Sequence, residues 1–165
     1  RGSSTGVLVE DPYFRRNISG ASKAGIKVGV YFFTQAVTVA EAVEEASMAM
    51  SLVSGYHLSY PIFIDTESAS NGRANGLGQS SRTAIVKAFC QTVRNGGYKA
   101  GVYASKSWFR DQLNASALNS YCIWVAQYSG SCTYSGRYDL WQHTSKGKVS
   151  GITGNVDMNI SYVGY

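Results

Sequence analysis

The sequence is poor in charged residues, cysteine, histidine and proline, and these shortages exclude several classes of protein. Only 15% of its 165 residues are charged, which is typical of an ordered globular chain rather than a disordered one. The three cysteines form no Cys-x-x-Cys pair, and the two histidines, His57 and His143, lack the His-Glu-x-x-His pattern of metalloproteases, so no metal site is predicted. No apolar run approaches the roughly 20 residues that cross a bilayer. We therefore expect no membrane insertion.

Several ligand-binding motifs are also missing. The sequence has no Gly-x-Gly-x-x-Gly turn, no phosphate-binding P-loop and no Gly-x-Ser-x-Gly elbow, so nothing predicts a dinucleotide, a nucleoside triphosphate or a serine hydrolase. The net charge is +5 and the pI is about 9.1, yet the basic residues are scattered. No dense basic patch predicts a nucleic-acid groove. A basic surface of this kind also suits other polyanions, including an acidic cell wall.

The cysteines leave the redox state open. Cys122 and Cys132 flank a turn rich in Tyr, Ser and Gly, and their spacing is compatible with a disulfide and equally with two reduced thiols. Cys90 lies in a helical pattern and is expected to be a small core residue. The chain starts at Arg1 without an initiator Met, and no signal peptide is visible.

Segments typical of strands and helices alternate along the chain. Thr38 followed by Glu41 predicts a helix N-cap. The expected helices cover residues 15–25, 38–57, 80–94 and 106–118, and the expected strands cover residues 27–34, 61–66, 99–104, 122–127, 137–142 and 155–159.

This alternation predicts the α/β class, with a parallel sheet covered by helices. Two arrangements fit: a doubly wound sheet and a (β/α) barrel. A barrel needs eight strands, and six are visible, with helices that shorten toward the C-terminus. We therefore expect an irregular TIM-like (β/α) barrel that is incomplete at the N-terminus, formed by residues 1–165 as a single catalytic domain.

The sharpest chemical feature is Asp65-Thr66-Glu67 after the apolar run Ile62–Ile64. Side chains two residues apart on a strand point to the same side, so both carboxyl groups are expected to share one face at the end of the strand. Active sites of barrels lie at this end. Two nearby carboxyl groups raise the pKa of one of them, which then serves as a general acid, the usual arrangement for glycoside hydrolysis. Solvated carboxylates at a strand end are the alternative interpretation.

Further candidates lie on other predicted strands. Asp157 lies in the last one and is expected to face the central site, although a solvated loop residue fits the pattern equally well. Aromatic side chains on several strands would form a cleft that stacks on sugar rings, with Tyr128, Tyr134 and Tyr138 at its rim. The strand aromatics are Tyr31, Phe33, Tyr103, Trp124 and Trp141. Each of them alone fits a core position as well.

The ordered set of segments resembles glycoside hydrolase family 25, the lysozymes of the Chalaropsis type. Asp65-x-Glu67, then Trp141-Gln142, then Val156-Asp157-Met158-Asn159 are its most specific part. The segments are DPYFRRN (11–17), AGIKVGVYFF (24–33), YPIFIDTE (60–67), AGVYAS (100–105), IWVAQY (123–128), YDLWQHTS (138–145) and GNVDMN (154–159).

The resemblance implies an irregular barrel that cleaves the β-1,4 bond between N-acetylmuramic acid and N-acetylglucosamine in peptidoglycan. It implies that Glu67 is the general acid, that Asp65 supports a substrate N-acetyl group, and that Asp157 is a further active-site acid. It also implies that Gln142 joins the aromatic residues in substrate binding. Metal and organic cofactors are not expected, the partner is the glycan strand of the bacterial wall, and the place of action is extracellular or cell-wall associated.

The chain departs from the family at its N-terminus. The family has another active-site Asp on the first strand, in a Gly-x-Asp-x-Ser setting that nothing here matches. Arg1-Gly2 resembles the end of the second strand, so we expect the first strand, the first helix and most of the second strand to be missing from this chain. An absent N-terminal segment would supply them. Two alternatives stay open: a chitinase-like hydrolase, and a non-catalytic barrel that binds the wall.

Overall fold

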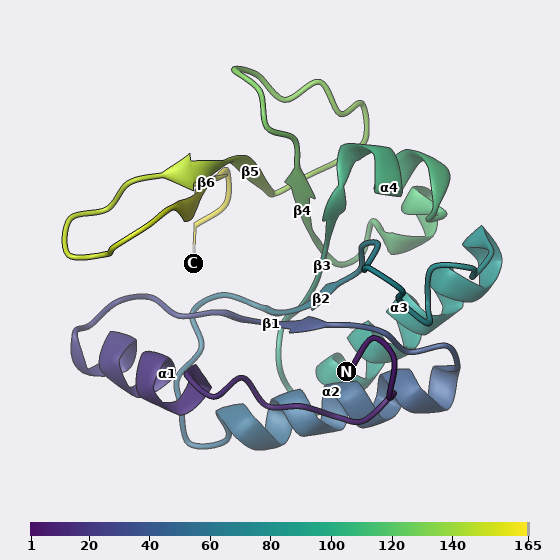
Figure 1. Ribbon diagram of the computed structural model, residues 1–165, viewed down its shortest axis with the longest axis horizontal. Helices are drawn as coiled ribbons and strands as arrows, with labels where there is room; N and C mark the ends of the chain where they lie inside the picture. The colour runs from purple at the N-terminus through teal and green to yellow at the C-terminus, as the bar shows by residue number, and fades with distance from the viewer. Residues whose placement is uncertain (165) are drawn as a thin grey trace.

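A computed structural model describes residues 1–164 and contains one six-stranded sheet (Figure 1). All six expected strands are present, and the strand order in the sheet follows the order in the sequence. The prediction placed the fifth strand too early, because it starts at Leu140 rather than Arg137. The strands are β1 (Val30–Phe33), β2 (Ile62–Asp65), β3 (Ala100–Ser105), β4 (Cys122–Ala126), β5 (Leu140–Gly147) and β6 (Val156–Ser161).

Helices connect the first strands, as the alternating pattern predicts. The expected helix over residues 106–118 is broken into two pieces, separated by a turn around Asn114. Thr38 caps the second helix as predicted, because its side chain accepts a hydrogen bond from the Glu41 backbone N–H. The helices are α1 (Phe14–Lys23), α2 (Val39–Val53), α3 (Gln79–Asn95), α4 (Lys106–Asp111) and a 3₁₀ turn at Ala115–Leu118.

Strands β1 to β5 run parallel to one another, which confirms the α/β class. The expectation of an all-parallel sheet is wrong for the last strand, because β6 returns antiparallel to β5 through a short connection that contains no helix. Strands β1 and β6 lie at opposite ends of the strand order and do not pair with each other. The sheet is therefore a partial barrel with two open edges.

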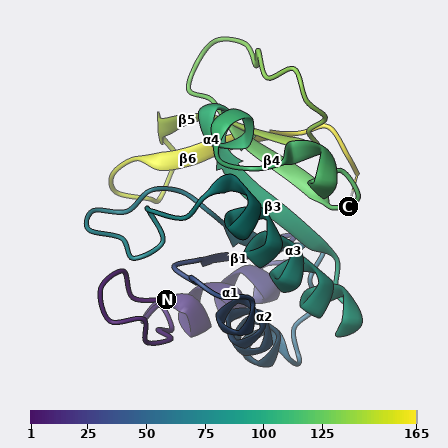
Figure 2. The same cartoon turned by 90° about the vertical axis from the view of Figure 1, so that its right-hand side faces the viewer.

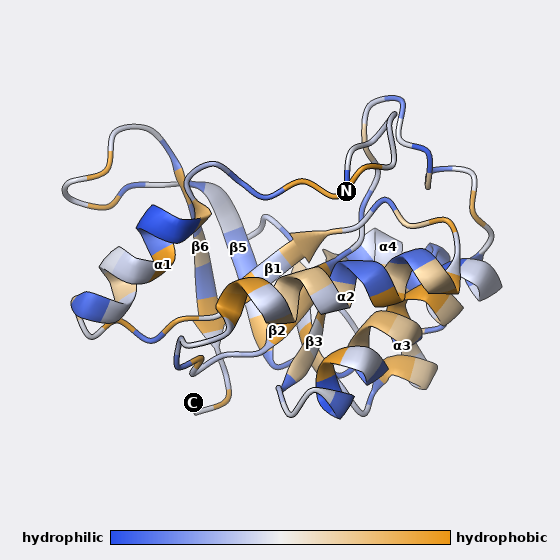
Figure 3. Cartoon of the chain, turned by 90° about the horizontal axis from the view of Figure 1, so that it is seen from below, coloured by the Kyte–Doolittle hydropathy of each residue, from blue (hydrophilic) through white to orange (hydrophobic). Residues whose placement is uncertain are grey.

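The apolar core lies between the sheet and the helices. Figure 2 shows α2 and α3 side by side, and Figure 3 shows both of them in front of the strands. Residues at every second position of the central strands, such as Ile62, Ile64 and Val102, are fully buried against these helices. Phe32 of β1 meets Phe89 of α3 with ring centroids 6.3 Å apart. This face of the sheet, called the outer face below, holds the fold together.

The N-terminal segment is tied to β1 and α2. The Arg1 amino group donates to the Phe33 carbonyl oxygen at 3.0 Å, and its guanidinium Nε donates to Glu45 Oε1 at 3.0 Å. Glu45 is buried and also accepts a hydrogen bond of 2.6 Å from Thr34 Oγ1. These bonds satisfy a carboxylate that would otherwise be costly to bury.

Among residues 1–164, no helix combines the length and apolar character that a membrane crossing requires.

Candidate active site

Asp65 and Glu67 lie at the carboxyl end of β2, next to the ends of β1 and β3. Asp65 is the last residue of the strand and only 7% exposed, whereas Glu67 follows the strand and is exposed. The backbone here is fixed on both sides: Thr34 N–H donates to the Asp65 carbonyl oxygen at 2.9 Å, and Thr66 N–H donates to the Tyr103 carbonyl oxygen at 3.1 Å. The end of β2 thus places the Asp65 carboxyl group in the interior and the Glu67 carboxyl group at the surface.

The Asp65 carboxyl group is unusual because it is buried and incompletely hydrogen-bonded. Its Oδ1 atom has no hydrogen-bond partner. Burial, followed by the nearby Glu67 carboxylate, raises the pKa of Asp65 to about 8. Both causes disfavour the ionised form. At neutral pH, Asp65 therefore retains a proton that an ordinary aspartic acid has lost.

The structure brings the third predicted acid, Asp157, into the same electrostatic environment. Glu67 is exposed but partly removed from water by its neighbours, and this partial desolvation, followed by the Asp157 carboxylate, raises its pKa. The pKa of the Tyr31 hydroxyl is raised by burial and then by Asp65, Asp11, Asp157 and Glu67. The Tyr31 hydroxyl thus interacts electrostatically with all three predicted acids. It also senses Asp11, which the sequence did not single out because it lies in a polar turn before α1.

Three aromatic rings pack beside Asp65 on the inner face of the sheet, the face opposite α2 and α3. Trp124 lies edge-on to Phe63, with ring centroids 5.1 Å apart, and edge-on to Tyr103 at 4.8 Å. Gly101 pairs with Phe63 in the sheet, and a Cβ atom there would lie 2.3 Å from the Phe63 ring. Glycine is therefore needed for the ring to lie over β3. Phe63 was not predicted as a site residue, since it reads as one more apolar residue of a buried strand.

Gln142 connects two tyrosines of this face. The hydroxyl groups of Tyr103 and Tyr128 both donate to Gln142 Oε1 at 2.8 Å. Burial and nearby Tyr128 raise the pKa of Tyr103. Tyr128 lies just after β4 and is 57% exposed, so its ring is held at the hydroxyl end while much of it stays open to solvent. Across the sheet, Trp124 Nε1–H donates to Asn159 Oδ1 at 2.9 Å.

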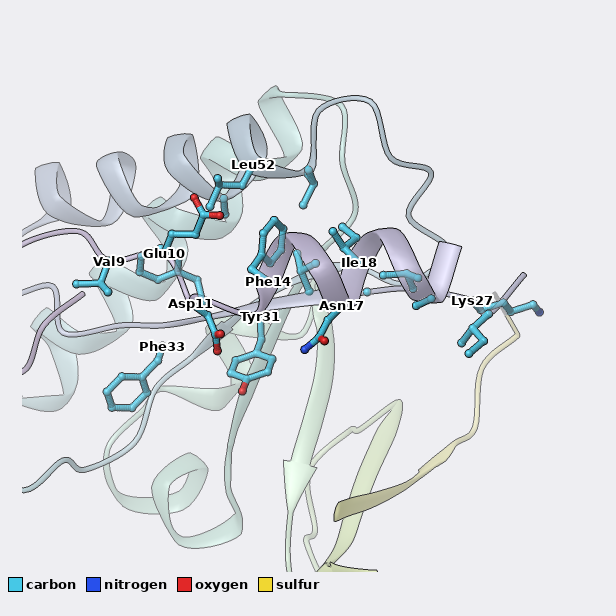
Figure 4. A pocket seen from close by; sticks show the side chains of 18 of the residues that line it. Val9, Glu10, Asp11, Phe14, Asn17, Ile18, Lys27, Tyr31, Phe33 and Leu52 are labelled. Atoms are coloured by element: carbon cyan, nitrogen blue, oxygen red, sulfur yellow. The ribbon is translucent and has the colours of Figure 1, made fainter. Parts of the chain in front are cut away.

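Trp141 does not join the inner face, so the structure does not bring it together with the other residues predicted to bind substrate. It is 6% exposed and belongs to the core cluster on the outer face, one position along β5 from Gln142. Its Nε1–H donates to the Gln127 carbonyl oxygen at 2.8 Å. Phe33 and Tyr31, in contrast, both project from the inner side of β1 (Figure 4). Phe33 is half-buried and pairs with Asp65 in the sheet.

A cavity of about 600 Å³ lies beside β1. Its wall is formed by the N-terminal segment, α1, β1 and the end of α2, with Phe14, Ile18 and Leu52 among its apolar residues (Figure 4). Tyr31 and Phe33 also line it, but Asp65, Glu67 and Asp157 do not. The predicted acids instead lie on the open inner face. The cavity is thus a slot at the edge of the sheet in which charged residues, among them Arg1, Glu10 and Asp11, stand beside apolar ones.

The three cysteines are free thiols. Cys122 and Cys132 both lie in the described part of the chain and are not joined by a disulfide, and Cys90 is buried. Within residues 1–164, no three His, Cys, Asp or Glu side chains are grouped so that they could hold a metal ion.

Comparison with known proteins gives the same picture as the geometry. The family model described as "Glycosyl hydrolases family 25" matches residues 3–152, a range that includes Asp65 and Glu67 and ends before Asp157. The chain is 28% identical to the autolytic lysozyme of Clostridium acetobutylicum over 160 residues, which are 95% of this chain and 46% of that protein. It is also 28% identical to the uncharacterized protein YegX of Escherichia coli, covering 96% of this chain and 56% of YegX.

Solved structures show the same fold. The modular autolysin LytC from Streptococcus pneumoniae, in complex with a synthetic peptidoglycan ligand, matches 92% of this chain and 37% of its own, with a TM-score of 0.81 and 28% identity. The catalytic domain of endolysin ply40 from bacteriophage P40 of Listeria monocytogenes matches 94% of this chain and 77% of its own, with a TM-score of 0.77 and 26% identity. The chain spans about half the length of the curated relatives it matches. Because the family model covers most of the chain, the chain belongs to glycosyl hydrolases family 25.

Proposed function

We propose that this protein is a peptidoglycan hydrolase, a muramidase that cleaves the β-1,4 bond between N-acetylmuramic acid and N-acetylglucosamine. The observation that carries the proposal is the carboxyl pair at the end of β2, in which Asp65 is buried with an Oδ1 atom that has no hydrogen-bond partner and Glu67 is exposed. Family membership and the peptidoglycan ligand bound to LytC support the choice of substrate. Extracellular or wall-associated action follows from that substrate.

Glu67 is the proposed proton donor, because it is the exposed member of the pair and can reach a glycosidic oxygen. Partial removal from water and the Asp157 carboxylate raise the pKa of Glu67, which favours the protonated form that a proton donor needs. A bound sugar would exclude water from Glu67 and raise its pKa further. Asp65 would then be the partner that supports the substrate N-acetyl group, and Asp157 would tune Glu67 through its charge.

Substrate binding is assigned to the inner-face aromatics. Tyr31, Tyr103 and Trp124 lie close to the acids or pack beside them, and Phe33 stands next to Asp65 in the sheet. Gln142 holds two tyrosine hydroxyl groups in place. Exposed aromatic faces next to fixed polar groups suit a pyranose ring, which has both apolar and hydroxyl surfaces.

The test compares Glu67→Gln with Glu44→Gln, the same chemical change at an exposed position of α2. Loss of general acid catalysis should lower the rate of wall cleavage by roughly 10²–10⁴-fold in the first variant and leave the second unchanged. Release of reducing sugar from purified cell walls measures the rate. A Glu67→Gln variant with wild-type activity would remove Glu67 from this role.

Two rival functions are separated by adding chitin as a second substrate and sedimentation with peptidoglycan as a second measurement. A chitinase-like enzyme would cleave chitin as readily as cell walls, and a wall-binding barrel would sediment with peptidoglycan without releasing sugar. NMR analysis of the first-formed anomer addresses the mechanism. Retention supports attack by the substrate N-acetyl oxygen, whereas initial inversion would contradict it.

We also propose that residues 1–165 form one catalytic domain whose sheet is completed by a further strand along β1. Val30 and Thr34 donate their N–H groups to β2, so Tyr31 and Phe33 direct theirs to the open edge. The slot beside this edge, and exposed Val9, which lines it, support the proposal. In a longer chain that includes the reading frame upstream of Arg1, hydrogen exchange at Tyr31 and Phe33 should slow. Unchanged exchange would contradict it.

A further inference from the structure

Arg82 of α3 is a buried cation without an acidic partner. It is 3% exposed, and none of the ion pairs among residues 1–164 includes it. Its Nε atom is buried and has no hydrogen-bond partner, and burial lowers its pKa. A buried guanidinium normally has a carboxylate beside it, since an unpaired charge is costly to remove from water. Its position therefore requires another explanation.

The guanidinium is used to fasten the loop that follows the carboxyl pair. Arg82 Nη2 donates to the carbonyl oxygens of Ala74 at 3.0 Å, Asn75 at 3.3 Å and Leu77 at 3.0 Å. These carbonyl groups belong to the segment 66–78, which joins the end of β2 to the start of α3 and contains Glu67. One side chain thus gathers three backbone groups of a loop that has no regular secondary structure to order it.

Other hydrogen bonds join the C-terminal half of this loop to its N-terminal half and to the segment that follows β1. The Asn75 side chain bonds Ala69 in both directions, accepting from its N–H at 3.1 Å and donating to its carbonyl oxygen at 2.7 Å. Buried Gln35, just after β1, accepts from the Ala74 N–H at 3.3 Å. The part of the loop held by Arg82 is therefore coupled to Ala69, two residues beyond Glu67.

A second path leads from Arg82 to the residue between the two acids. Its guanidinium carbon lies 4.8 Å from the centroid of the Trp108 ring. Trp108 Nε1–H in turn lies 3.4 Å from Thr66 Oγ1. Thr66 stands between Asp65 and Glu67 in the chain, so the Arg82–Trp108 stack abuts the carboxyl pair from the helix side.

We propose that Arg82 is a positioning residue for the carboxyl pair: it fixes the loop 66–78 and Trp108, and through them holds Glu67 beside Asp65. The expected effect of Arg82 on the catalytic rate rests on the proposed function. The effect of Arg82 on the placement of Glu67 relative to Asp65 does not depend on that function. The planar guanidinium of Arg82 combines two contacts: Nη2 donates to the loop carbonyl groups, and the guanidinium stacks on the Trp108 ring, which an ammonium group does less well.

The proposal predicts a change that a merely stabilising role would not produce. The Glu67 carboxylate contributes to the raised pKa of Asp65. If the loop loosens and Glu67 moves away, the pKa of Asp65 should fall, although burial still keeps it above its ordinary value. A ¹³C NMR titration of the Asp65 carboxyl carbon, assigned by comparison with Asp65→Asn, reports this pKa without any need for activity.

The experiment uses Arg82→Lys and Arg82→Met with matched controls at Arg94. Arg94 lies on the same helix, stacks on Tyr121 at 4.3 Å and donates to the Ser120 carbonyl oxygen, but it is far along α3 from the loop. Both Arg82 variants should lower the pKa of Asp65 and reduce kcat by roughly 10–100-fold with little change in KM, since a small misplacement of a catalytic group is costly. Arg94→Lys and Arg94→Met should change neither.

Trp108→Phe gives a milder check if Arg82→Met folds poorly, because it keeps a ring under the guanidinium and deletes only the contact with Thr66. It should shift the pKa of Asp65 in the same direction by a smaller amount. If folded Arg82→Lys and Trp108→Phe keep the wild-type titration of Asp65, the proposal is overturned, whatever their activity. If the wild-type protein cleaves no peptidoglycan but the titration shifts, positioning stands and the proposed function fails.

Discussion

The two faces of the central strands carry alternating residues of the same segments and yet differ in almost every physical respect. On the outer face, Ile62 and Ile64 are fully buried against α2 and α3. On the inner face of the same strand, Phe63 packs against Trp124, and Asp65 holds a buried carboxyl oxygen without a hydrogen-bond partner. The outer face stabilises the fold, while the inner face contains groups whose burial costs free energy.

This contrast also runs from the centre of the sheet to its edges. Tyr31 on the edge strand β1 is 66% exposed, whereas Tyr103 on the central strand β3 is buried, although both lie on the inner face. The central strands are covered on one side by helices and flanked by strands on both edges. Residues placed there are fixed by their neighbours, so the deepest acid of the site belongs to β2.

Shortening a side chain that packs against the outer face should have the largest effect on stability. Phe89→Ala removes a fully buried ring that packs against Phe32, and it should lower the free energy of unfolding by about 3–5 kcal/mol. Urea denaturation followed by circular dichroism measures the change. Tyr13→Ala, at an exposed aromatic residue, is the control and should have little effect. Similar losses in the two variants would contradict the assignment of the core to the outer face.

Asp65→Asn should have the opposite effect and should depend on pH. Because the folded pKa of Asp65, about 8, lies above its unfolded value, folding takes up a proton between these two values. The wild-type protein therefore loses stability as pH rises from about 4 to 8, and the neutral amide avoids this loss. The variant should be more stable than wild type at pH 8, on the order of a few kcal/mol, and nearly equal to it at pH 4.

Parallel denaturation curves at the two pH values test this prediction, since titrating groups away from the site contribute equally to both proteins. A stability difference that does not change with pH would show that Asp65 is ionised in the folded state across this range. The variant should also lose wall-cleaving activity, which would mark Asp65 as a residue kept for function at the expense of stability.

Local patterns predicted most of the fold from the sequence. The Thr38 cap, the apolar spacing of α3 and the run Ile62–Asp65 each depend on neighbours in the chain, and each was placed within a few residues. The reversal of β6 was missed, because strand direction depends on which edge the returning chain reaches. A strand pattern carries no sign of that direction.

The candidate site was predicted only in part, because local alternation is visible in the sequence while the pairing between strands is not. Alternation along β2 identified its carboxyl pair, but two tryptophans on strands looked equivalent in the sequence. Trp124 packs on Tyr103 on the inner face, whereas Trp141 pairs with Val125 and belongs to the core cluster, and the register of β5 against β4 decides this difference. The role of Arg82 was invisible, since its partners are backbone carbonyl groups, which every residue carries.

The smallest expected effects concern the two tyrosines that share Gln142 on the inner face. In Tyr103→Phe or Tyr128→Phe, one hydroxyl donor is lost while the other still satisfies Gln142 Oε1, so each variant should lose only about 0.5–1 kcal/mol. The double variant leaves a buried acceptor without a partner and should lose about 1 kcal/mol more than the sum. A double-mutant cycle in urea measures this coupling. Strict additivity would mean that water replaces the hydroxyl groups freely, and that the inner face around Gln142 is wetter than its burial indicates.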